Sequence, residues 1–222
     1  MTPTLRVSLA AFSALALLAG CATSGFLDLR APIAVSGNAD AGAQKAAVCT
    51  ACHGPNGVSP VPNFPNIAGQ KFDYLYWQLV ELKHRDDSSS PMTPILAPMS
   101  DTDLRDLAAH FAAQAPAAAS GDANAFADGA RLYREGDPAR GIAPCQGCHG
   151  AHADGHLDGE AVRHRTYPSL RGQHSMYLAQ RLHDFRDGKY LLSSNDHIMH
   201  GVAQALDDQA IQQLAGWLQS AP

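Results

Sequence analysis

The strongest constraint on the fold is an internal repeat in which three blocks of sequence recur in the same order. Residues 47–54 (AVCTACHG) return at 143–150 (APCQGCHG), and residues 64–70 (FPNIAGQ) return at 167–173 (YPSLRGQ). The apolar set at 104, 107, 108 and 111 returns at 211, 214, 215 and 218. This pattern predicts a tandem duplication, with domains at 37–115 and 122–222 and a linker at 116–121 that begins with a proline.

Each copy is predicted to be helical. The apolar residues at 104, 107, 108 and 111 have the spacing of one face of an amphipathic helix, and Ser100 with Asp101 and Asp103 provides a cap and two acids at its start. No segment alternates convincingly with period two, so no sheet is expected. The predicted fold is therefore all-α. Domains of about 80 to 100 residues bury only a modest core unless something non-protein fills the centre.

The N-terminus has the features of an export signal. Arg6 precedes thirteen uncharged residues, 7–19, which are too few to cross a bilayer as a helix. The ending Leu-Ala-Gly-Cys at 18–21 resembles a bacterial lipobox, which predicts a signal peptide at 1–20, acylation of Cys21 and an unfolded tether at 21–36. The alternative is a secretory signal cut elsewhere, with Cys21 lost or left as a free thiol.

A Cys-x-x-Cys-His sequence occurs at the same place in both repeats. In an exported protein it is a c-type haem attachment signal, in which two thiols bond one porphyrin and the histidine binds the iron. A thioredoxin-like pair would need a strand before the motif, and a zinc site a second Cys or His pair. We therefore predict two haem c groups, attached at Cys49 and Cys52 and at Cys145 and Cys148, with the irons bound by His53 and His149.

A sixth ligand to iron is expected from methionine, which raises the reduction potential. Met92 lies eight residues before Ser100, and Met199 lies eight before Asp207, the equivalent helix start. The other methionines do not match between the copies: Met99 stands where the second copy has Leu206, and Met176 lies outside any ligand pattern. In the second copy His197 and His200 remain alternatives to Met199.

Pro65 lies twelve residues after His53, and its counterpart is Pro168. A proline carbonyl can accept a hydrogen bond from the second ring nitrogen of a ligating histidine and so orient the ring. The alternative is that both prolines only shape their loops.

The chain resembles the dihaem cytochrome c4 family. The resemblance rests on the two CxxCH motifs, the paired Pro-x-x-x-Gly-Gln blocks, LYREG at 132–136 and SDTDL at 100–104, and it covers roughly 37–222. It implies two class I cytochrome c domains related by a pseudo-twofold axis, with haem edges facing each other. It also implies the ligand pairs His53 with Met92 and His149 with Met199.

The function that this resemblance implies is electron transfer in the periplasm, with no enzymatic activity. The implied donor is a quinol-oxidising complex (quinol-cytochrome c oxidoreductase), and the acceptor is a terminal oxidase or another periplasmic redox enzyme. The lipobox adds a membrane anchor to this picture. An alternative is a dihaem peroxidase or thiosulfate dehydrogenase, which needs one haem with an open position. A permanently docked haem subunit is a third possibility.

Two further features bear on partners. An insertion at 151–166 adds His152, His156 and His164 near the second motif; it could bind zinc or copper, but solvated histidines are the favoured interpretation. The net charge is -5, from 16 Lys+Arg and 21 Asp+Glu, which argues against a nucleic-acid partner.

Overall fold

The computed structural model describes residues 26–85, 87, 89–156 and 161–222, and within these residues every regular element is helical. The predicted signal peptide and Cys21 therefore lie outside the described residues. The first domain holds α1 (Ala39–Lys45), α2 (Ala47–His53), α3 (Phe72–His84), α4 (Met92–Leu96) and α5 (Asp101–Ala112). The second holds η1 (Ala123–Phe126), α6 (Ala127–Glu135), η2 (Pro138–Arg140), α7 (Gln146–His149), η3 (Val162–Thr166), α8 (Ser175–Arg186), α9 (Ser194–Ala203) and α10 (Asp208–Ser220).

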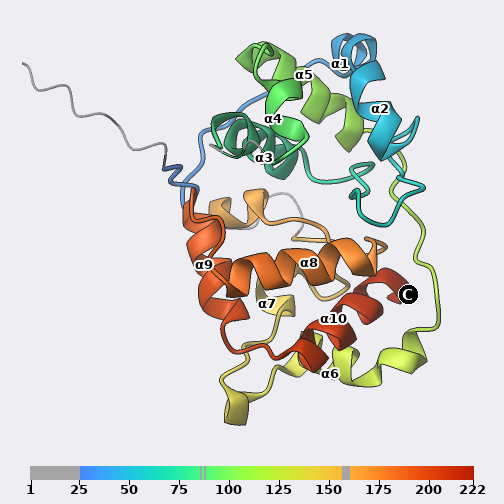
Figure 1. Ribbon diagram of the computed structural model, residues 1–222, viewed down its shortest axis with the longest axis vertical. Coiled ribbons are helices and arrows are strands. Elements are labelled where there is room, and N and C mark those ends of the chain that lie inside the picture. The colour runs from blue at the N-terminus through green and yellow to red at the C-terminus, as the bar shows by residue number, and fades with distance from the viewer. Residues whose placement is uncertain (1–25, 86, 88, 157–160) are drawn as a thin grey trace, which may run out of the picture.

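The two domains repeat one arrangement of helices. In the first, α1 and α3 pack on α5, and in the second α6 and α8 pack on α10. Figure 1 shows the first domain above the second, with the linker running down one side between them. The predicted all-α fold is confirmed.

Local sequence signals account for the last helix of each domain. Ser100 accepts a hydrogen bond from the backbone of Asp103, whose carboxylate accepts one from the backbone of Ser100, so the predicted cap is confirmed. Asp207 caps α10 by accepting from the N–H of Ala210, 2.8 Å away. The predicted apolar face of α5 is buried, and the equivalent face of α10 is buried in the second core.

The tether prediction is wrong for part of its length. Leu27 donates to the carbonyl of Leu192 at 2.8 Å and accepts from the N–H of Ser194 at 2.9 Å. Leu29 is 4% exposed. Figure 1 shows this segment, in blue, beside α9. The segment is rich in small and polar residues, which predicts an unfolded tether, but two leucines fix part of it. Leu29 buries apolar surface, and the backbone of Leu27 pairs with the extended backbone around Ser193.

The domains are in direct contact through the repeated blocks 64–70 and 167–173 and through side chains around them. Arg165 forms an ion pair with Asp73 at 2.8 Å, and Tyr190 donates to Asp87 at 3.0 Å. Among the helices of the described residues, none is long and apolar enough to span a bilayer.

Candidate haem sites

The first CxxCH motif forms α2, which brings Cys49, Cys52 and His53 onto one short helix. The helix ends at Gly54, which has φ +78° and lies so close to Val58 that a β-carbon would be 2.0 Å from its carbonyl oxygen. Only glycine fits there, because other residues rarely adopt this φ and the carbonyl leaves no space. The turn leaves His53 7% exposed.

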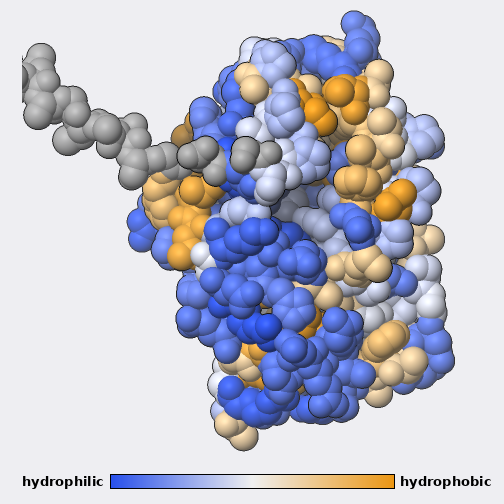
Figure 2. Space-filling view, viewed as in Figure 1, coloured by the Kyte–Doolittle hydropathy of each residue, from blue (hydrophilic) through white to orange (hydrophobic). Residues whose placement is uncertain are grey.

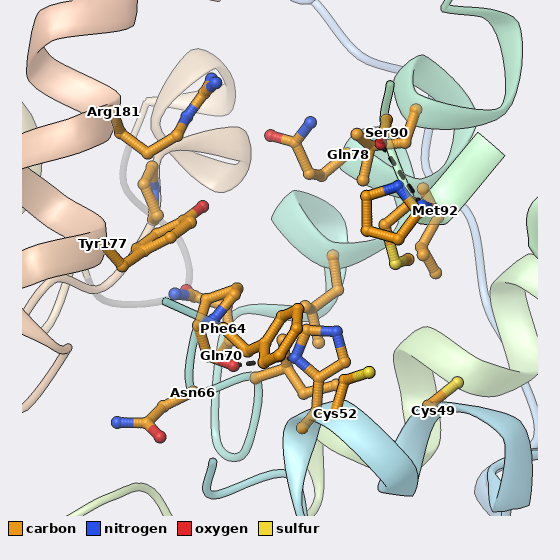
Figure 3. Close-up of a pocket in the computed structure, with 18 of the residues that line it drawn as sticks. Cys49, Cys52, Phe64, Asn66, Gln70, Gln78, Ser90, Met92, Tyr177 and Arg181 are labelled. Atoms are coloured by element: carbon orange, nitrogen blue, oxygen red, sulfur yellow. Dashed lines mark hydrogen bonds between the residues drawn. The ribbon is translucent and has the colours of Figure 1, made fainter. Parts of the chain in front are cut away.

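A cavity of about 470 Å³ opens beside this helix and extends to the second domain. Its lining includes Cys49, Cys52, His53 and Met92, and Figure 3 shows the two cysteines and Met92 around one space, with Tyr177 and Arg181 of α8 across from them. The rest of the wall near the motif is mostly apolar, with Leu75, Leu79, Leu82, Ile95, Leu96 and Phe111.

The ring of His53 is fixed by the chain. Its Nδ1 donates to the carbonyl of Pro65 at 2.9 Å, and the ring lies edge-on to Phe64 at 6.2 Å between centroids. Burial lowers the pKa of His53, and the Pro65 carbonyl opposes that shift. A neutral ring with Nδ1 engaged leaves Nε2 to bind a metal.

The second motif repeats this geometry on α7. His149 is 7% exposed, and its Nδ1 donates to the carbonyl of Pro168 at 3.0 Å. Burial lowers its pKa, while the Pro168 carbonyl acts against the shift. The ring lies 6.3 Å from that of Tyr167, the counterpart of Phe64. Gly150, at φ +82°, ends the helix as Gly54 does.

The cysteines do not fit a thiolate redox or zinc site. Burial raises the pKa of Cys49, and it raises the pKa of Cys145 to about 11, whereas reactive or metal-binding thiols have lowered values. None of the four motif cysteines is in a disulfide. Across the described ranges there is no group of three or more His, Cys, Asp or Glu that could hold a metal ion.

The methionines differ in their surroundings. Met92 lines the cavity, whereas Met99 packs against the first core without lining it, and Met176 is 56% exposed. Met199 is half-buried on α9. Of the alternatives in the second copy, His200 has Nδ1 bonded to the carbonyl of Phe185 at 2.7 Å, and exposed His197 packs its ring against Phe26.

Two histidines of the insertion make contacts that solvated side chains would lack. His156 stacks on His164 with 4.1 Å between ring centroids, and both are half-buried, while His152 is exposed. The carbonyl of His156 accepts a hydrogen bond from Lys71 of the first domain at 2.5 Å. This part of the insertion therefore belongs to the domain contact.

Several functional candidates in the cavity were missed by sequence reasoning. Arg85 and Arg181 line it; the side chain of Arg85 is buried and that of Arg181 is half-buried. Nε of Arg85 is buried with no hydrogen-bond partner among the described residues. A carboxylate entering the cavity would satisfy this donor. The apolar wall, the paired thiols, the neutral histidine and the arginines together fit a haem with its two carboxylate-bearing side chains.

The fold and the duplicated site define a dihaem c-type cytochrome of class I. Residues 126–222 match the family described as cytochrome c. The chain is 39% identical to cytochrome c4 of Pseudomonas aeruginosa over 184 residues, which cover 83% of this chain and 89% of that protein. It is 32% identical to a thiosulfate dehydrogenase electron acceptor of Thiomonas intermedia, with 80% of each covered.

The crystal structure of reduced recombinant cytochrome c4 from Pseudomonas stutzeri has a TM-score of 0.75 and 38% sequence identity, covering 84% of this chain and all of that one. The chain therefore belongs to the cytochrome c4 family, with two covalently bound haem c groups, and it is an electron carrier.

Proposed function

We propose that this protein carries single electrons through the periplasm, from a membrane quinol-oxidising complex to a terminal oxidase or another periplasmic redox enzyme. The observation that supports this best is the duplication of the site. Both buried histidines end a CxxCH helix, and both donate Nδ1 to a proline carbonyl at 2.9 and 3.0 Å. Two sites with matching histidine geometry in contacting domains suit electron passage better than a single catalytic centre.

The proposed axial ligands are His53 with Met92 and His149 with Met199. Met92 is supported by its place on the wall shared with Cys49 and Cys52. Met199 is supported by the two contacts of the His200 ring, whose Nδ1 donates to the carbonyl of Phe185 and whose Nε2 accepts from Nε2 of Gln204 at 3.1 Å, so that neither ring nitrogen is left for iron. The exposure of His197 supports it as well. A methionine thioether as the second protein ligand would raise the reduction potential and would take the coordination position that a small molecule could otherwise occupy.

Each bound haem supplies one-electron chemistry between Fe(II) and Fe(III). The chain does the rest: four cysteines hold the two haems, the proline carbonyls orient the histidines, and the leucines of α3 keep water from the first site. Such rigid surroundings hold the ligand geometry the same in both oxidation states, which favours fast transfer.

The proposed methionine ligands would leave no open position at either iron, which favours a carrier over the dihaem enzyme alternative, since a peroxidase or a thiosulfate dehydrogenase needs such a position. The relative named as a thiosulfate dehydrogenase electron acceptor supports one refinement, in which a periplasmic dehydrogenase donates the electrons. Steady-state assays with peroxide and thiosulfate test the enzyme alternative, and turnover by the purified protein alone would favour it.

A partner can approach the first haem over an apolar rim. Val48, Val58 and Val61 are 41–45% exposed and lie close in sequence to the first motif. Figure 2 shows apolar residues on the right side of the first domain and a second apolar patch at the left over α9, while the middle of the second domain is hydrophilic on this face. A small apolar patch with a polar surround suits brief docking of redox partners.

We further propose that Cys21 is acylated and holds the protein at a membrane. Because Leu27 is bonded to the second domain, the chain is held there only six residues after Cys21. The five Cα–Cα steps from Cys21 to Phe26 span at most about 18 Å. The anchor would thus hold the α9 side of the second domain near the bilayer, which suits exchange with membrane complexes.

The test is a redox titration of the purified full-length protein, following its visible and near-infrared bands. The expected result is two haems per chain, each with the charge-transfer band of a thioether-bound ferric iron. One haem per chain, or a site without that band, would contradict the proposal. Mass spectrometry of membrane-extracted protein checks the lipid on Cys21.

A further inference from the structure

The peptide unit between Pro65 and Asn66 is hydrogen-bonded on both sides. Its carbonyl accepts from Nδ1 of His53 at 2.9 Å, and its N–H donates to Oε1 of Gln173 in the other domain at 2.8 Å. One amide plane therefore connects the first histidine to a side chain of the second domain.

The second site has the same arrangement in reverse. The carbonyl of Pro168 accepts from Nδ1 of His149 at 3.0 Å, and the N–H of the same peptide unit, on Ser169, donates to Oε1 of Gln70 at 2.9 Å. Each domain thus supplies a glutamine to the peptide that orients the other domain's histidine.

The orientation of both glutamines follows from their partners. Nε2 of Gln173 donates to the carbonyl of Asn66, and Nε2 of Gln70 donates to the carbonyl of Ser169, both at 2.8 Å. Each Oε1 also accepts from the N–H of its own next residue, His174 at 3.0 Å or Lys71 at 2.8 Å. Reversing either amide would set an NH₂ group against two N–H donors.

These bonds lie out of water. Asn66, Gln70 and Gln173 are 7–8% exposed. In such surroundings hydrogen bonds polarise one another, by about 10–30% per bond. An acceptor on the peptide N–H increases the negative charge on its carbonyl, which then draws the Nδ1 proton of the histidine more strongly. The histidine becomes a more basic ligand, which stabilises Fe(III) and lowers the reduction potential.

We propose that Gln173 tunes the haem held by His53 and that Gln70 tunes the haem held by His149, each acting across the domain contact through one peptide unit. Both side chains also lie on the cavity wall, but in this role they are positioning residues that act through the peptide unit and the histidine. The proposal rests on the axial roles of His53 and His149 in the proposed function. The reduction potential of each haem then depends on contact with the other domain. Each haem should have a lower reduction potential when the two domains are in contact than when its domain is alone.

The test uses Gln173→Met and Gln70→Met in the full-length dihaem protein. The amide is lost while the side chain keeps its length. With Gln173→Met, the Fe(III):Fe(II) ratio of the haem at Cys49 and Cys52 should fall about threefold at fixed ambient potential, or about 28 mV at 59 mV per tenfold change. The other haem should keep its potential. Gln70→Met should give the converse result, with each haem followed by its own NMR methyl signals.

His174→Ala is the matched control. Nε2 of His174 bonds to the carbonyl of Ser59 across the same contact at 3.0 Å, without touching either peptide unit. This variant should leave both potentials unchanged. A shift of both haems together in the glutamine variants, a shift of the haem in the variant's own domain, or an equal shift in His174→Ala would overturn the proposal.

A second variant and a second measurement keep the proposal testable if the methionine variants fold poorly. Gln173→Glu keeps an oxygen facing the Asn66 N–H, so it should move the Nδ1 proton resonance of His53 downfield, while Gln173→Met moves it upfield. Movement in one direction for both variants, or no movement, would overturn the tuning role. The two proposals can be separated. If wild-type spectra show histidine and methionine ligands at both irons but the glutamine variants change neither the potentials nor the Nδ1 resonances, this inference is overturned and the proposed function is not.

Discussion

Gly42 on α1 lies directly against the backbone carbonyl of Asp106 on α5, where a β-carbon on the glycine would be 2.0 Å from the carbonyl oxygen. The second domain has the same contact between Gly129 on α6 and the carbonyl of Gln213 on α10, again at 2.0 Å. The first and last α-helices of each domain therefore touch backbone to backbone, which brings the two ends of each domain together.

Gly42→Ala and Gly129→Ala should each destabilise one domain, because the methyl group has no space and the helices must move apart. Overpacking of this kind costs about 1–3 kcal/mol. Gly201→Ala is the control, since no heavy atom of the described residues outside its own helix neighbourhood lies within 4 Å of its β-carbon position. That change should stabilise α9 by about 0.5–1 kcal/mol. Urea unfolding followed by circular dichroism measures both, and equal effects would contradict the close contact.

The parts of the fold that the sequence predicts are local in character. The cap at Ser100 and the buried face of α5 depend on residues within one helix, and CxxCH with its following glycine depends on one turn. The matching positions of Met92 and Met199 required the repeat as well, because a ligand distant in sequence cannot be found from local spacing.

The contacts between domains could not be predicted in this way. Gln70 and Gln173 stand in the repeated blocks, but their partners lie 99 and 107 residues away, and only docking brings them together. The pairing of Leu27 with Leu192 and Ser194 is equally long-range. The repeat itself carries one signal. A glutamine that recurs at the same position of both blocks, outside the CxxCH motif, indicates a role that both domains share.

Met92→Ala should remove the thioether from the first iron. The potential of that haem should fall, the near-infrared charge-transfer band should halve in intensity, and carbon monoxide should bind one Fe(II) per chain. Met99→Ala is the matched control on the same segment: it should cost about 1 kcal/mol of stability, because Met99 is only half-buried, and leave spectra unchanged. Loss of the band in Met99→Ala alone would reverse the assignment.

Met199→Ala should produce the same three changes at the second haem. His200→Gln tests the alternative ligand, because glutamine can keep a hydrogen bond near the Phe185 carbonyl but binds iron poorly. If Met199 is the ligand, His200→Gln should keep both charge-transfer bands. Electron paramagnetic resonance of the ferric protein distinguishes the cases, and a bis-histidine signal in wild type that disappears in His200→Gln would contradict Met199.

Leu29→Ala should destabilise the second domain by about 2–3 kcal/mol, because Leu29 is 4% exposed and its N–H is held by Ser194 Oγ at 2.9 Å. Ile33→Ala is the control for the same segment, since Ile33 is 66% exposed and should change stability by less than about 0.5 kcal/mol. Hydrogen exchange at the Leu27 and Ser194 amides reports the pairing directly. Similar protection in both variants would mean that Leu29 does not hold the segment in place.

Lys45→Met should reduce the acid sensitivity of the first domain. Nζ of Lys45 lies 2.7 Å from Asp103 and 2.8 Å from Asp106, and its hydrogen bonds are the main cause that lowers the pKa of both carboxyls. Ser100 lowers the pKa of Asp103 further, and the backbone of Asn38 does the same for Asp106. Because the folded-state values lie below the ordinary 3.8, this stability is present above about pH 4 and is lost as pH falls through the folded-state pKa values.

The variant should therefore be less stable than wild type at pH 7 and should lose less stability between pH 4 and lower pH. Arg131→Met serves as the control, since Arg131 is exposed and lies 3.9 Å from Asp128. Its unfolding midpoint should follow the wild-type pH dependence, because exposed pairs at that distance contribute little. Thermal unfolding across the acid range measures the slopes. A slope for Lys45→Met as steep as that of wild type would show that other carboxylates control the acid transition.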